Sequence, residues 1–162
     1  LDLGEQLKTM GLLVITDAIL NRVTENWRAG RRTHVYLDEF HVVYENPYSS
    51  MFFTSAWRRF RKRNAFPTGI TQNVEYLLDN TSARSMLSNS EFIVMHNQAA
   101  SDREKLAALF NISEQQMSYI TNAEAGHGLM KIGNALVPFV NRFPKNTELY
   151  RRMTTKPNEK FE

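Results

Sequence analysis

The stretch His34–Phe40, with the sequence HVYLDEF, constrains the fold of this chain more than any other segment. It is an apolar, β-prone run that ends at two adjacent carboxylates, Asp38 and Glu39. A buried strand that carries such a pair to its carboxyl end suits nucleotide hydrolysis, because one carboxylate can hold Mg²⁺ through water and the other can polarise an attacking water. A core strand followed by a polar turn is the alternative interpretation of the same residues.

The residues before this strand predict one long helix over about residues 5–28, because apolar side chains recur there at spacings of three and four. Further apolar residues in its first half, among them Leu7, Met10 and Val14, indicate that this half is deeply buried. Gly30 suits the left-handed residue that ends a helix. A helix followed by a wholly apolar strand is typical of an α/β fold with a parallel sheet.

The rest of the chain is predicted to continue with helices and strands and to end in a β-hairpin. Capping boxes at Ser101 and Ser113 mark the starts of two helices. The expected elements are a helix at 49–64, a strand at 68–71, helical turns at 73–78 and 82–87, a strand at 91–95, helices at 101–110 and 113–121, and hairpin strands at 129–132 and 135–140. We expect residues 1–162 to form a single domain, with an irregular tail at 141–162.

Three of the predicted strands end in polar residues: Asp38-Glu39, Gln72 and His96-Asn97. Because the carboxyl ends of parallel strands lie along one edge of a sheet, we expect these side chains to lie together. A strand ending in Asp-Glu, followed by a neighbouring strand ending in Thr-Gln, is the order found in RecA-like motor ATPases. In that interpretation Asp38 is the Walker B aspartate, Glu39 the catalytic base and Gln72 a sensor of the γ-phosphate. The alternative is a coincidental acidic pair followed by a coincidental Gln.

A cluster of five cations falls within the seven residues from Trp57 to Arg63. A solvated helix face is the commonest fate of such a charge run. The cluster could also bind DNA phosphates. In a third interpretation one arginine, Arg61 or else Arg58, reaches the γ-phosphate held by a neighbouring subunit, which requires a ring of subunits.

Composition excludes several other kinds of site. The chain has no cysteine, which rules out disulfides, thiolate zinc sites and cysteine nucleophiles. Its four histidines have no metal-ligand spacing, and His41 is expected to pack against or cap its loop rather than to transfer protons. The net charge of +3 is too small to indicate nucleic-acid binding by the chain as a whole.

No G-x-x-x-x-G-K-[ST] segment occurs in the 162 residues, so the phosphates of a nucleotide have no Walker A cradle here. Either the protein is not a P-loop enzyme, or its P-loop lies upstream of residue 1. The chain opens with Leu1-Asp2-Leu3-Gly4, which resembles a strand entered in mid-domain. We therefore expect a fragment of a longer polypeptide.

Several segments together resemble the VirB4/TraE/TrsE-type ATPases of conjugation and type IV secretion. They are residues 35–41 (VYLDEFH), 58–63, 67–74 (PTGITQNV), 137–144 (VPFVNRFP), 149–150 and 154–157. The resemblance implies an α/β fold: part of a RecA-like P-loop NTPase domain with a mostly parallel central sheet flanked by helices, a C-terminal β-hairpin, and no Walker A half.

The resemblance also implies site residues and cofactors. ATP and Mg²⁺ are the expected cofactors, with Asp38 as the Walker B residue that holds the metal through water and Thr71 beside it in the nucleotide site. Glu39 becomes the base, Gln72 the sensor, and Arg61 (alternatively Arg58) the arginine that acts in trans. Without a P-loop, the 162-residue piece alone is expected to be inactive.

As for partners, the resemblance implies a self-oligomer, with a hexameric ring expected in the intact protein. It implies a cytoplasmic location at the inner face of the cell membrane, next to a type IV secretion channel and coupling proteins. DNA is a possible substrate, and the sequence leaves DNA and protein substrates open. Two alternatives are a DNA-translocating motor of the FtsK/HerA or coupling-protein kind and a degenerate, non-catalytic assembly scaffold.

Overall fold

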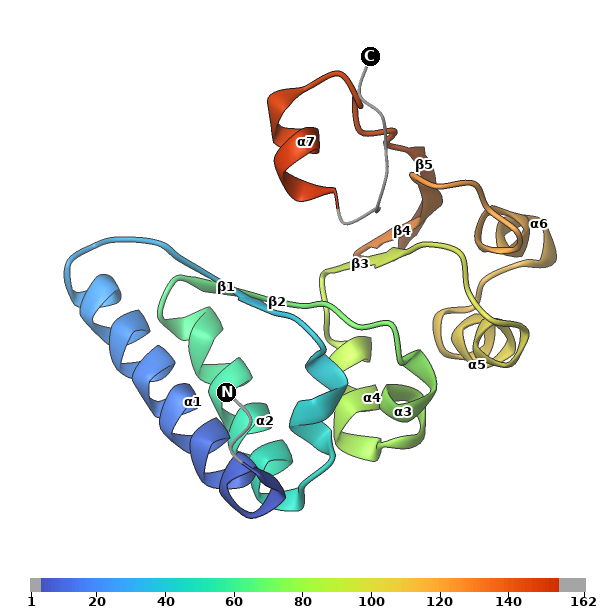
Figure 1. Cartoon of the computed structure of the whole chain (residues 1–162). Helices are drawn as coiled ribbons and strands as arrows, with labels where there is room; N and C mark the ends of the chain where they lie inside the picture. Colours follow the sequence, from blue (N-terminus) through green and yellow to red (C-terminus); the bar gives the residue numbers. More distant parts are fainter. Residues whose placement is uncertain (1–3, 155–162) are drawn as a thin grey trace. The chain divides into compact units, whose positions relative to one another are not determined.

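The structure is a computed structural model that describes residues 4–154, and the chain divides into two units (Figure 1). Unit 1 is Leu1–Asn89 and unit 2 is Ser90–Glu162. Unit 1 contains α1 (Gly4–Arg28), β1 (Thr33–Leu37), the 3₁₀ helix η1 (Phe40–Tyr44), α2 (Pro47–Lys62), β2 (Ala65–Gly69), α3 (Val74–Asp79) and α4 (Thr81–Ser88).

In unit 1, β1 and β2 pair in parallel, with Thr33 opposite Ala65 and Leu37 opposite Gly69. Figure 1 shows α1 and α2 on the same side of this pair. Apolar residues of both helices meet the strands there in one core cluster, formed by Leu20, Val23, Ala56, Phe60 and Ala65. The parallel pair and its preceding helix confirm the predicted α/β arrangement.

Two burial predictions for unit 1 are wrong. The strand at His34–Asp38 is not buried on both faces, because exposure alternates along β1 and Tyr36 is 68% exposed. The first half of α1 is not deeply buried either, since Met10 and Val14 are 63% and 67% exposed. At 1.5 Å per residue, α2 is about 24 Å long and α1 about 37 Å, so α2 can cover only part of α1.

The end of α1 follows the prediction made for Gly30. Its φ is +69°, in the left-handed region that favours glycine, and its N–H donates to the carbonyl of Trp27 at 3.0 Å. The side chain of Asn26 then donates to the hydroxyl of Thr33 at 3.0 Å, which fixes the start of β1 against the end of the helix.

Unit 2 is built on a three-stranded antiparallel sheet in the order β3-β4-β5. Its elements are β3 (Phe92–Met95), α5 (Ala100–Phe110), α6 (Glu114–Met117), the 3₁₀ helix η2 (Ser118–Ile120), β4 (His127–Ile132), β5 (Ala135–Val140) and α7 (Glu148–Met153). The hairpin β4-β5 turns at Gly133-Asn134 as predicted, and Pro138 lies on an edge strand.

The position of β3 corrects one expectation. It pairs antiparallel with β4, so its carboxyl end at His96-Asn97 belongs to a different sheet from Asp38-Glu39. Parallel pairing among the described residues is limited to β1 and β2. An apolar run predicts a strand but not its partner, and the free edge of β4 accepts this one.

Local helix signals had mixed outcomes in unit 2. The capping box at Ser113 is present, with Gln116 as its second member. The box predicted at Ser101 is wrong, because α5 begins after Ala99, which has no side-chain cap. The stretch expected to be irregular contains α7, and its residues 155–162 lie outside the described part.

Among the described residues, none of the helices combines the length and the apolar character that crossing a bilayer requires.

Candidate functional site

The candidate site lies where β1 and β2 end, at residues 38–41 and 70–73, which we call the carboxyl edge. The N–H of Ile70 donates to the carbonyl of Leu37 and the N–H of Phe40 to the carbonyl of Ile70, both at 2.8 Å. A Cβ on Gly69 would lie 2.7 Å from the Phe40 ring, so only glycine fits beside it. Phe40 is 3% exposed and anchors the turn in the core of unit 1.

The turn after β1 determines how the two carboxylates are presented. Asp38 accepts a hydrogen bond from the N–H of Glu39 at 2.9 Å. Glu39 has φ 47° and ψ 46°, in the left-handed region that non-glycine residues rarely adopt. Such a conformation costs on the order of 1–3 kcal/mol and often occurs at functional sites.

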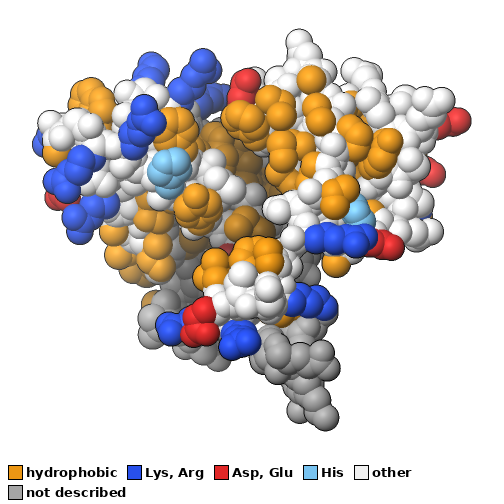
Figure 2. All heavy atoms as spheres, turned by 90° about the horizontal axis from the view of Figure 1, so that it is seen from above, with side chains coloured by type: hydrophobic (Ala, Val, Ile, Leu, Met, Phe, Trp, Pro, Cys, Tyr) orange, Lys and Arg blue, Asp and Glu red, His pale blue; other side chains and the backbone are white. Residues whose placement is uncertain are grey.

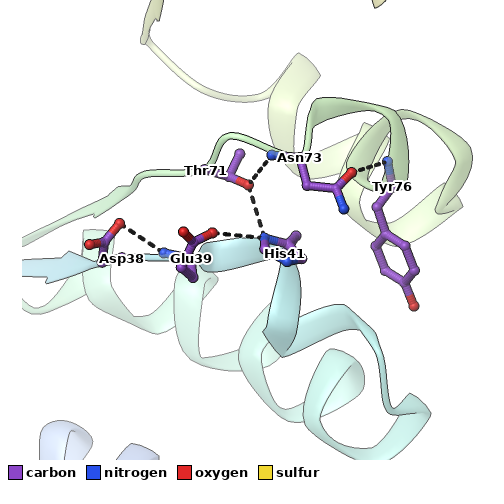
Figure 3. Close-up of polar contacts among 6 residues, drawn as sticks. All are labelled: Asp38, Glu39, His41, Thr71, Asn73 and Tyr76. Carbon is purple, nitrogen blue, oxygen red and sulfur yellow. Dashed lines mark hydrogen bonds and ion pairs between the residues drawn. The ribbon is translucent and has the colours of Figure 1, made fainter.

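His41 connects the end of β1 to the segment after β2 (Figure 3). Its Nδ1 lies 3.4 Å from the Glu39 carboxylate and 3.1 Å from the Thr71 hydroxyl. The hydroxyl of Thr71 in turn accepts from the N–H of Asn73 at 3.1 Å. When Nδ1 carries a proton, it can donate that proton to either oxygen, so His41 joins the acidic pair to the Thr71 segment.

The first turn of α3 extends this network. The side chain of Asn73 accepts from the N–H of Tyr76 at 3.4 Å, and the rings of Tyr76 and His41 meet edge to face at 6.5 Å between centroids. The Tyr76 hydroxyl donates to the carbonyl of Tyr44 at 3.2 Å. Burial raises the pKa of Tyr44 to about 12, and a hydrogen bond with Thr54 opposes part of that shift.

No protein-family model matches this chain, and no curated protein sequence matches it either. Among solved structures, VirB4 of Thermoanaerobacter pseudethanolicus matches with a TM-score of 0.77 and 23% identity over 92% of the chain. The chain has a VirB4-like fold. It spans 40% of the length of that VirB4 chain, and the likeness at this identity concerns the fold alone.

Within this VirB4-like fold, three predicted site residues are linked and three are not. Asp38 and Glu39 are joined through His41 to Thr71. Gln72 follows Thr71 in the chain, and its side chain is exposed. Arg58 and Arg61 are exposed on α2 and, among the described residues, make no hydrogen bond or ion pair with either carboxylate. Since α2 leads into the amino end of β2, Arg61 lies about one strand length, on the order of 15 Å, from that edge.

The two carboxylates at the carboxyl edge could supply the acidic half of a Mg²⁺–nucleotide site. Mg²⁺ in such sites takes one or two carboxylates, and phosphates and water supply the rest of its ligands. Asp38 and Glu39 supply that number, and the described residues contain no group of three or more His, Asp or Glu side chains that could hold a metal by themselves. The 162-residue sequence has no Walker A segment, so these residues fit the acidic half and not the phosphate-binding half.

The sequence predicts that His41 packs against its loop, and it does, with its side chain 17% exposed. The sequence does not predict the contacts of His41 with Glu39 and Thr71. The available signal was its spacing of two residues after Glu39, but Thr71 is 30 residues away in sequence and only the paired strands bring it close.

Proposed function

We propose that this chain is part of a VirB4-type ATPase that powers conjugative transfer or type IV secretion, and that the carboxyl edge is the acidic half of its nucleotide site. The observation that supports the proposal is that Asp38 and Glu39 follow one of two paired parallel strands and are linked through His41 to Thr71, which follows the other. The VirB4-like fold supports it.

In this proposal ATP and Mg²⁺ are the cofactors, and Mg²⁺ neutralises charge that develops on the phosphates. Asp38 holds the metal through water. Glu39 takes a proton from the attacking water, which its half-exposed carboxylate can reach. Thr71 lies in the nucleotide site and Gln72 donates a hydrogen bond toward the γ-phosphate.

His41 acts as a positioning residue in the same proposal. Glu39 adopts a left-handed conformation on a turn and is exposed, so its side chain needs a partner to hold one orientation. The imidazole supplies that partner and is itself anchored by Thr71. A shift of Gln72 on contact with phosphate would therefore reach Glu39 through two neighbouring side chains.

The remaining roles belong to the assembled protein. Arg61, or alternatively Arg58, reaches the nucleotide of a neighbouring subunit, which fits their exposure on α2 and their distance from the carboxyl edge of their own chain. We propose a ring, with six subunits as the leading number, at the inner face of the cell membrane next to a secretion channel and coupling proteins. The chain without a phosphate-binding loop is inactive in this proposal.

The test is Glu39→Gln in the intact protein, measured as steady-state ATP hydrolysis. Loss of the base should lower kcat by about 10²–10⁴-fold and leave ATP binding in place. The matched control is Glu104→Gln, which removes the same charge from an exposed position on α5. Unchanged turnover in the Glu39 variant would remove the catalytic assignment and leave the assembly-scaffold alternative.

A further inference from the structure

Unit 1 carries its positive charges at one end. Figure 1 shows α1 and α2 ending on the same side, where β1 and β2 begin, and Arg63 ties the two helices by donating to the hydroxyl of Thr24. Nine of the eleven Lys and Arg residues in positions 1–89 lie at or near this end. This group, which we call the basic end, is Arg22, Arg28, Arg31, Arg32, Arg58, Arg59, Arg61, Lys62 and Arg63.

Acidic residues are nearly absent from the same segments. Glu25 is the one acid within residues 22–34 and 58–63. Asp38 and Glu39 follow the opposite ends of the strands, and Glu75 and Asp79 lie on α3. The remaining acids of the described part of unit 1 include Asp17 within α1 and Glu45 after η1, so the cations gather at one end whereas the acids are dispersed away from it.

The cations of the basic end are open to solvent. All of them are exposed except Arg63, and Figure 2 shows Lys and Arg side chains gathered on the left, over unit 1. Among the described residues, the ion pair found here is Arg22 with Glu25 at 3.7 Å. Exposed cations without acidic partners favour a polyanion, because its binding releases condensed counterions.

The arrangement of these cations suits a flexible polyanion better than a flat one. At about 100° per residue, Arg59 and Arg61 lie on opposite flanks of the buried Phe60, and Lys62 lies on the far side of α2. A flat lipid surface can contact only one side of this helix turn, whereas a single strand of nucleic acid can wrap around it. Eight of the nine are arginines, whose planar forks bind phosphates through two hydrogen bonds.

An aromatic pair adjoins the basic end. At the start of the strands, His34 and Phe66 stack at 5.2 Å between ring centroids, and Phe66 is 47% exposed. Exposed rings beside cations form stacking platforms for bases.

We propose that the basic end of unit 1 binds single-stranded nucleic acid, with phosphates on Arg59 and Lys62 of α2 and on Arg31 and Arg32 of the α1–β1 turn. The proposal does not depend on the ATPase assignment, because its contacts involve neither the carboxyl edge nor Arg58 and Arg61, the two candidates for the arginine that acts in trans.

The test uses the 162-residue chain and a fluorescently labelled oligothymidylate of about 20 nucleotides, longer than the site size of a typical single-strand-binding module. Binding is measured by fluorescence anisotropy over a range of NaCl concentrations, without nucleotide. We expect Arg31→Gln with Arg32→Gln to weaken binding and to reduce the slope of log K against log salt by about 1.4, at 0.7 per lost phosphate contact. Arg59→Gln with Lys62→Gln should do the same from a separate segment, which guards against a folding defect in either pair.

The matched control is Arg151→Gln with Arg152→Gln on α7, which removes equal charge from unit 2. An equal loss of affinity in the control would overturn the proposal, since net charge alone would then explain binding. Absence of oligonucleotide binding at low salt would also overturn it. The proposal would also be overturned if the chain sedimented with phosphatidylglycerol vesicles but did not bind the oligonucleotide. That result would assign the surface to a membrane.

Discussion

The two ends of unit 1 differ in how their charged side chains are held. At the carboxyl edge, Asp38, Glu39 and His41 have partners within the chain, and Phe40 anchors the turn in the core. At the basic end, seven exposed cations have no acidic partner among the described residues. The first arrangement fixes geometry, which chemistry requires. The second leaves positive charge free to bind a partner outside the chain.

Substitutions test this contrast, and the greatest loss of stability is expected at Phe40. Phe40→Ala should lower the free energy of unfolding by about 3–5 kcal/mol, because its ring packs against Tyr44 and Trp57 at 5.5 and 5.2 Å between centroids. Urea denaturation followed by circular dichroism measures the change. Phe66→Ala is the control, because Phe66 is 47% exposed beside the basic end, and it should lower the free energy of unfolding far less. Equal losses of stability in the two variants would contradict the difference in packing between the two ends.

Tyr44, next to the carboxyl edge, should make stability depend on alkaline pH. Its pKa is about 12 in the folded chain and 10 when unfolded, so the unfolded state loses its proton first and stability falls as pH rises above 10. By pH 11 the loss from this group should be about 1.4 kcal/mol. Tyr44→Phe cannot ionise, so the wild-type advantage measured at pH 8 should shrink by that amount at pH 11. A difference that is the same at both pH values would argue against a buried, titrating Tyr44.

His41 should affect turnover more than nucleotide binding in the intact protein. We expect His41→Ala to lower kcat roughly five- to tenfold, since a lost side-chain hydrogen bond costs about 1 kcal/mol and 1.4 kcal/mol corresponds to tenfold. His41→Asn, which keeps a polar atom near the Nδ1 position, should recover part of the loss.

Thr71→Val tests the contact between Thr71 and His41. If His41 acts through Thr71, the double variant should lose little more than either single one. Fully additive losses would show that the two residues act separately, and His41 would then not be a positioning residue for Glu39.

The smallest expected effect on stability is at the basic end. Arg31→Gln with Arg32→Gln should change the free energy of unfolding by less than about 0.5 kcal/mol, because both side chains are exposed and unpaired within the described residues. Urea denaturation checks this. A loss above about 1 kcal/mol would mean that these arginines support the fold rather than a partner.

Local patterns in the sequence were sufficient for several features. The strand at 34–38, its terminal carboxylates, the left-handed Gly30 and the capping box at Ser113 each depend on residues within about one turn of one another. Neighbours in sequence are neighbours in space on that scale, so spacing alone predicts them.

Other features were decided only by the tertiary structure. The antiparallel partner of β3, the exposed first half of α1, and the contact of His41 with Thr71 each depend on which edges and faces meet across tens of residues. The same is true of the basic end, where Arg31 and Arg32 join a cluster almost thirty residues later. Hydrophobic periodicity reports that a face is apolar, but the length and position of the covering element decide whether it is buried.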